Sequence, residues 1–121
     1  MSWELNTDKP VYLQLVDQIQ AEIISGNYKP GDKLPSVRDL AAQATVNPNT
    51  MQRAMTELER DGLVYTNRTT GRFITSDEDL IKQLKKQYIT RIIEEFLDRM
   101  KLLGLELDEI ISYVNQVAEK K

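Results

Sequence analysis

Apolar residues recur at intervals of three and four along most of the chain, which is the spacing of amphipathic helices. The first such stretch covers residues 10–25, and Gly26 and a Pro-Gly turn at residues 30–31 end it. Its apolar face consists of Val11, Leu15, Ile19 and Ile23. The pattern predicts a helix over residues 10–25, followed by an ordered loop.

Two further helices are predicted, and a tight turn joins them. Ser36 precedes Asp39 by three residues, which is the arrangement of a helix N-cap with an acid in the first turn, and it predicts a short helix over residues 36–43. Asn47 is followed by a proline, a residue favoured in the first helical turn, and predicts a third helix that ends near Asp61. The apolar residues of this third helix share one face, so the opposite face is left polar.

Residues 63–66 and 72–75 are rich in β-branched and aromatic side chains and flank a polar segment over residues 67–71. This pattern predicts a hairpin with a polar tip. Helix, helix, turn, helix and hairpin in this order are typical of a winged helix-turn-helix, whose third helix enters the major groove of DNA. We therefore expect a mainly α fold with a small β-wing, and a winged helix-turn-helix domain over residues 1–76.

Residues 77–121 form two more amphipathic stretches, a long one interrupted near Gly104 and a shorter one over residues 107–117. Two such helices present more apolar surface than one small domain covers, so we expect a helical tail that pairs two copies of the chain. The predicted dimerisation residues are Leu84, Tyr88, Ile92, Phe96, Met100, Ile110 and Val114.

The composition removes several classes of function. No Cys and no His occur among the 121 residues, which removes thiolate catalysis, sulfur-ligated zinc and the usual proton shuttle. The sequence contains no Gly-rich phosphate loop and no activated nucleophile, so we expect no enzyme, metal or cofactor. No apolar stretch approaches the roughly 20 residues that span a bilayer, and the N-terminus lacks a leader pattern, so we expect a cytoplasmic protein without a membrane partner.

The net charge of −3 argues against DNA binding only when it is taken over the whole chain. Residues 33–75 carry six basic and four acidic side chains, whereas residues 77–121 carry eight basic and ten acidic ones. The predicted winged domain is therefore locally positive, so the case for DNA binding depends on where its basic residues lie.

Several runs of this domain closely resemble the GntR family of bacterial regulators. The resemblance covers roughly residues 9–75 and is carried by Gly26–Ser36, Leu34–Ala41, Asn47–Ala54 and Leu58–Val64. The short helical tail is similar to that of the YtrA-type subgroup. The resemblance implies that Arg38, the start of the third helix and the hairpin near Gly71 face DNA.

The residue types agree with that implication. Arg binds the O6 and N7 of guanine bidentately, Asn and Gln bind adenine in the same way, and Thr contacts a thymine methyl or a phosphate. The free N–H groups at a helix N-terminus also favour a phosphate. The candidate DNA-binding residues are Lys33, Ser36, Arg38, Asn47, Pro48, Asn49, Thr50, Gln52, Arg53, Arg68, Gly71 and Arg72.

Simpler roles stay open for several of these residues. Arg38 is either a DNA contact or an ordinary solvated or ion-paired surface residue. Asn47 is a helix cap, a DNA contact or both. Arg53 is a DNA contact or the partner of Glu57 one turn later. The basic residues of the hairpin and Lys33 either contact phosphates and the minor groove or only keep the surface soluble.

The function that these predictions favour is a repressor that binds a pseudo-palindromic operator as a homodimer. The main alternative is a winged helix that binds another protein. The operator sequence, the target genes and the sign of regulation stay open. A small-molecule effector is a further hypothesis, with Tyr88, Phe96 and Tyr113 as the aromatic residues of its site.

Overall fold

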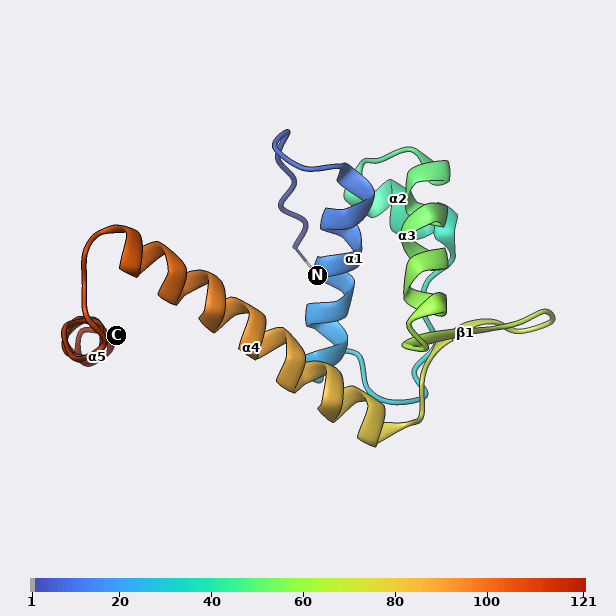
Figure 1. Cartoon of the computed structure of the whole chain (residues 1–121). Coiled ribbons are helices and arrows are strands. Elements are labelled where there is room, and N and C mark those ends of the chain that lie inside the picture. The colour runs from blue at the N-terminus through green and yellow to red at the C-terminus, as the bar shows by residue number, and fades with distance from the viewer. Residues whose placement is uncertain (1) are drawn as a thin grey trace. The chain divides into compact units, whose positions relative to one another are not determined.

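The computed structural model describes residues 2–121 and contains, within this range, five helices and two strands (Figure 1). The mainly α fold with a small β-wing is confirmed, and the elements follow the predicted order. They are α1 (Val11–Ile24), α2 (Val37–Ala44), α3 (Pro48–Arg60), β1 (Val64–Asn67), β2 (Gly71–Ile74), α4 (Glu78–Leu102) and α5 (Leu107–Glu119).

The predicted helix starts are confirmed in atomic detail. The Ser36 hydroxyl accepts a hydrogen bond from the backbone N–H of Asp39 at 3.1 Å and caps α2. The Asn47 side chain accepts from the N–H of Asn49 at 2.8 Å and caps α3. Between the two helices, Thr45 adopts a left-handed conformation with φ of 57°, which ends α2 abruptly and makes the turn tight.

The core of the first three helices and the hairpin is built around α3, which contacts α1, α2 and β1. The apolar face of α3 is buried, as the pattern predicts, and it meets apolar residues from all of these elements. The fully buried side chains include Leu15, Ile19, Leu40, Met51, Met55, Leu58, Leu63 and Ile74. The opposite face of α3 is thereby left to solvent.

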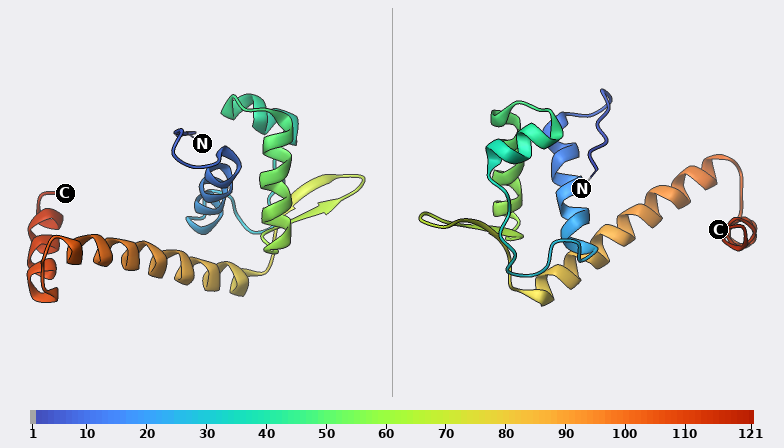
Figure 2. Two further views of the ribbon diagram at one scale, coloured as in Figure 1. Left: turned by 45° about the horizontal axis from the view of Figure 1, so that its top comes forward. Right: turned by 180° about the vertical axis from the view of Figure 1, so that it is seen from behind.

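The hairpin projects beyond the three helices in every view (Figures 1 and 2). Its strands are antiparallel, with Val64 opposite Ile74 and Thr66 opposite Arg72. The segment before α2 lies along β2, because the Leu34 N–H donates to the Arg72 carbonyl at 2.9 Å. Tyr65 and Phe73 stack on the hairpin with ring centroids 5.6 Å apart. The wing is therefore tied at its base to the residues that lead into α2.

The chain divides into two compact units, the first ending at Leu84 and the second being Lys85–Lys121. We expected the boundary at residues 76 and 77, but Ile81 and Leu84 pack against the core of the first unit. The expected role of Leu84 in a dimer seam is revised for the same reason, since the first unit partly covers its side chain. The first turns of α4 thus belong to the winged domain.

The second unit contains the rest of α4, a turn at Gly104 and α5. Gly104 has φ of +83°, and the Gly104 N–H donates to the Lys101 carbonyl at 2.9 Å, so the chain turns there. Figure 2 shows α5 crossing the end of α4. Ile110 is only 2% exposed, so the expectation that it lies in a dimer seam is also revised. No helix within residues 2–121 is long and apolar enough to cross a membrane.

Candidate nucleic-acid interface

The polar face of α3 carries several of the predicted DNA-binding residues. Asn49, Gln52 and Arg53 are exposed, and Thr50 is half-buried beside them. The side-chain oxygen of Asn47 is occupied by the cap, which accounts for one of the two roles considered for it. The N-terminus of α3 thus presents polar groups able to bond to base edges or a phosphate.

Arg38 lies on α2 and is exposed. Within the described part of the chain no hydrogen bond or ion pair engages its guanidinium, so it is not the partner of a neighbouring acid. All of its donors are available to a ligand. This placement is compatible with the predicted contact to a base or a phosphate.

Arg53 has a partner that the sequence pattern did not reveal. Its guanidinium carbon lies 3.7 Å from the centroid of the Tyr12 ring on α1. No ion pair joins Arg53 to Glu57 within residues 2–121, and Glu57 pairs with Arg60 at 3.0 Å instead. Tyr12 and Arg53 lie far apart in sequence, so no local spacing points to their contact.

Arg72 is not a free cation of the wing, in contrast to the role the sequence suggested. Its Nε lies 2.8 Å from a carboxylate oxygen of Glu59 on α3, and its Nη2 lies 3.4 Å from the side-chain oxygen of Gln52. Thr66 on β1 donates its hydroxyl hydrogen to the same carboxylate. Four side chains therefore join α3 to both strands of the hairpin.

Opposing effects set the pKa of Glu59. Partial burial raises the pKa, whereas the hydrogen bonds from Thr66 and Arg72 and the positive charge of Arg72 lower it. The lowering effects are larger together, so the pKa of Glu59 lies below its ordinary value. The carboxylate is charged at neutral pH and holds Arg72 in place.

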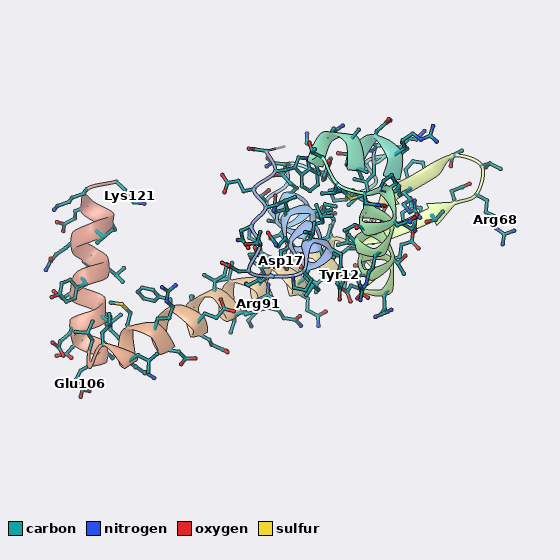
Figure 3. All side chains as sticks on the ribbon, turned by 90° about the horizontal axis from the view of Figure 1, so that it is seen from above. Tyr12, Asp17, Arg68, Arg91, Glu106 and Lys121 are labelled. Carbon is teal, nitrogen blue, oxygen red and sulfur yellow. The ribbon has the colours of Figure 1, made fainter. Side chains whose placement is uncertain are left out.

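An open groove of about 690 Å³ lies between the start of α2 and the hairpin. It brings together five of the predicted DNA-binding residues from three separate segments. They are Lys33, Ser36, Arg68, Gly71 and Arg72. Figure 3 shows Arg68 at the outer end of the hairpin, with its side chain directed away from the helices.

Gly71 brings the hairpin close to Lys33 at the edge of this groove. It has φ of +113°, a conformation that L side chains rarely adopt, and an added Cβ would lie 3.3 Å from the Cε of Lys33. A glycine at this position therefore lets the lysine stem lie against the strand. The groove has three basic side chains and one acidic one, Asp39. Of the three basic side chains, Arg72 is paired with Glu59, whereas Lys33 and Arg68 are in no ion pair within residues 2–121.

Residues 11–74, more than half of the chain, match the family model for the gntR family of bacterial regulatory proteins. The chain belongs to this family. The GntR-family chain is also 33% identical over 110 residues to the HTH-type transcriptional repressor YtrA of Bacillus subtilis, a match that covers 90% of this chain and 85% of the repressor. It is thus a DNA-binding transcriptional regulator.

Solved structures of the family share the fold. A GntR family transcriptional regulator from Listeria monocytogenes has 42% sequence identity and a TM-score of 0.88, over 93% of this chain and 98% of that one. The structure of AraR(DBD) in complex with operator ORE1 has 27% identity and a TM-score of 0.54, over 62% of this chain and 94% of that one. The first likeness includes the tail, and the second is to a structure that contains DNA.

Proposed function

We propose that this GntR-family chain is a repressor that binds a pseudo-palindromic operator as a homodimer, with α3 in the major groove and the hairpin at the minor groove. The observation that carries the proposal is that the polar face of α3 and the groove adjoin each other on the first unit. Gln52 on the polar face of α3 contacts Arg72, which lines the groove together with Lys33 and Arg68. The name of the YtrA relative supports repression.

The roles within the interface follow from side-chain chemistry. In this proposal Asn49 and Gln52 read adenine, and Arg38 binds a guanine or a phosphate, because their side chains have the matching donors and acceptors. Lys33 and Arg68 neutralise phosphates on either side of the groove, which supplies affinity without sequence preference. Ser36 and Asn47 act first as helix caps and each occupies one N–H group, and the other N–H groups at the starts of α2 and α3 are the ones proposed to bind the DNA backbone.

The second unit supports the proposed homodimer. Its helices expose large apolar side chains, including Ile92 at 50%, Phe96 at 39% and Val114 at 44%. With Tyr88 and Met100, these are the predicted dimerisation residues that neither core of the single chain fully covers. Pairing of such surfaces removes apolar area from water and would place two copies of α3 about one helical turn of DNA, roughly 34 Å, apart.

The effector hypothesis concerns the same unit. A hollow of about 600 Å³ at the end of α4 is lined by Phe96 and other apolar residues together with Glu95 and Arg99. A small molecule bound there would compete with or reshape the pairing of two tails, and so would alter operator affinity. Calorimetry with candidate metabolites tests this, and the absence of both heat and any change in operator affinity would reject it.

Selection from randomised duplex DNA at about 150 mM salt tests the main proposal. The full chain is expected to enrich a two-fold symmetric motif, and Arg38→Ala to lose it. Ile92→Asp places a charge in the proposed seam and is expected to weaken binding and to halve the mass measured by light scattering. Gln87→Asp, which adds the same charge at an exposed polar position of α4, is the matched control. Enrichment of no motif would reject operator recognition.

A further inference from the structure

The contacts between α3 and the hairpin lie at one polar cluster, formed by Gln52, Glu59, Thr66 and Arg72. Arg72 is the centre of the cluster, since its Nε bonds to Glu59 and its Nη2 to Gln52. Its side chain is 22% exposed and that of Glu59 is 33% exposed, so the pair lies at the edge of the core, where water reaches it only in part.

Two contacts of the cluster favour one orientation of the Gln52 amide. The side-chain oxygen of Gln52 accepts from Arg72, and its amide nitrogen donates to the Thr56 hydroxyl, each at 3.4 Å. These long contacts are weak, and an amide has two donor hydrogens and two acceptor lone pairs. One hydrogen and one lone pair therefore remain free, and the Gln52 side chain is exposed.

The free groups are the two that adenine recognition requires. Bidentate binding of adenine uses one amide donor and the amide oxygen, in a fixed plane. A glutamine on an exposed helix surface rotates about three side-chain bonds, and fixing it costs conformational entropy on binding. Contacts that orient the amide in the free protein lower this entropic cost of binding. An amide held in one orientation also disfavours bases that need another orientation.

We propose that Glu59 is a positioning residue for sequence readout: through Arg72 it orients the Gln52 amide and holds the hairpin against α3. The inference rests on the proposed function, because it assumes that α3 meets base edges. The competing explanation is that the pair of Glu59 and Arg72 only holds the hairpin in place. In that case loss of the pair changes affinity for all sequences alike, whereas loss of a positioning residue changes the preference at the base pair that Gln52 reads.

Four variants of the full chain separate these explanations. Gln52→Ala identifies the base pair that Gln52 reads. Glu59→Gln removes the negative charge that holds Arg72. Arg72→Lys keeps a cation beside Glu59 but lacks the second nitrogen with which the guanidinium contacts Gln52. Arg68→Ala is the matched control, since Arg68 lies at the outer end of the hairpin (Figure 3). Partly exposed ion pairs contribute little to stability, and circular dichroism melting checks that each variant folds.

The measurement is the affinity of each variant for the selected operator and for duplexes with single base-pair changes. Gln52→Ala is expected to lower discrimination at one base pair of each half-site by about fivefold or more. Glu59→Gln and Arg72→Lys are expected to lower it at that same base pair, and Arg68→Ala to lower affinity for all duplexes by a common factor. The inference is overturned if Glu59→Gln and Arg72→Lys keep that preference, or if Gln52→Ala changes none.

Failure of the proposed function gives a different result from failure of the inference. If the unmodified chain selects no motif, operator recognition itself fails, and the inference falls with it before any variant is compared. If the unmodified chain selects a symmetric motif, and the Glu59 and Arg72 variants keep its full base preference while Gln52→Ala loses it at one base pair, the proposed function stands and the positioning role is wrong.

Discussion

The guanidinium of Arg53 stacks on the ring of Tyr12 at 3.7 Å and joins the surface of α3 to α1. Arg53 is exposed and Tyr12 is half-buried, so the contact lies at the rim of the core. A cation over an aromatic ring at an exposed site contributes roughly 0.5–1 kcal/mol to stability. The same stacking restricts the side chain of Arg53 on the exposed surface of α3.

Tyr12→Leu is therefore expected to lower the free energy of unfolding by about 0.5–1 kcal/mol beyond its packing effect, because the ring face is lost. Tyr12→Phe keeps the ring and is the matched control. Urea denaturation of both variants, each with and without Arg53→Ala, forms a double-mutant cycle that isolates the contact. Additive effects of Tyr12→Leu and Arg53→Ala would show that the stacking contributes nothing.

One substitution distinguishes the two roles considered for Asn47, which are helix cap and DNA contact. Aspartate caps a helix as well as asparagine does, so Asn47→Asp is expected to keep the unfolding free energy, whereas Asn47→Ala is expected to lower it by about 1 kcal/mol. Near a phosphate the added negative charge repels DNA, so Asn47→Asp is expected to weaken operator binding. Thermal melting and operator titration of both variants measure the two effects. Unchanged operator affinity in Asn47→Asp would leave Asn47 with the capping role alone.

The elements that the sequence predicts well are those with local causes. The caps at Ser36 and Asn47 depend on residues two or three positions away, and the buried face of α3 depends on its own periodicity. The contacts of Tyr12 with Arg53 and of Glu59 with Arg72 join residues distant in sequence, and no spacing rule relates them. Only the folded arrangement shows that Arg72 already has an anionic partner.

The tail illustrates the same limit. An apolar stripe at helical spacing indicates that a face is covered, but not by what. Leu84 lies in that stripe and packs on the winged unit, and Ile110 is covered within the single chain. Ile92, Phe96 and Val114 follow the same spacing and stay exposed. Periodicity alone therefore does not separate a dimer seam from the chain's own core.

The ion pair between Glu59 and Arg72 makes the free energy of unfolding depend on pH. Burial raises the pKa of Glu59, but its hydrogen bonds and Arg72 lower the pKa further, so the folded-state pKa lies below the unfolded value of about 4.3. The stabilisation is complete above the unfolded pKa and is lost as pH falls through the folded pKa. Denaturation from pH 7 downward is expected to show Glu59→Gln less stable than the unmodified chain at neutral pH and equal to it in acid. A stability difference that persists unchanged in acid would contradict this origin.

The wing tip should affect operator binding through charge alone. Each phosphate neutralised by a basic side chain releases counterions, so the logarithm of affinity falls with the logarithm of salt concentration with a slope proportional to the number of contacts. Arg68→Ala is expected to reduce that slope by about 1, since Arg68 lies at the outer end of the hairpin and its side chain points away from the helices (Figure 3). Arg68→Lys keeps the charge and should keep the slope. Titrations of one operator duplex at several salt concentrations measure it. An unchanged slope in Arg68→Ala would mean that the hairpin tip does not reach a phosphate, and the proposed position of the wing at the minor groove would then be wrong.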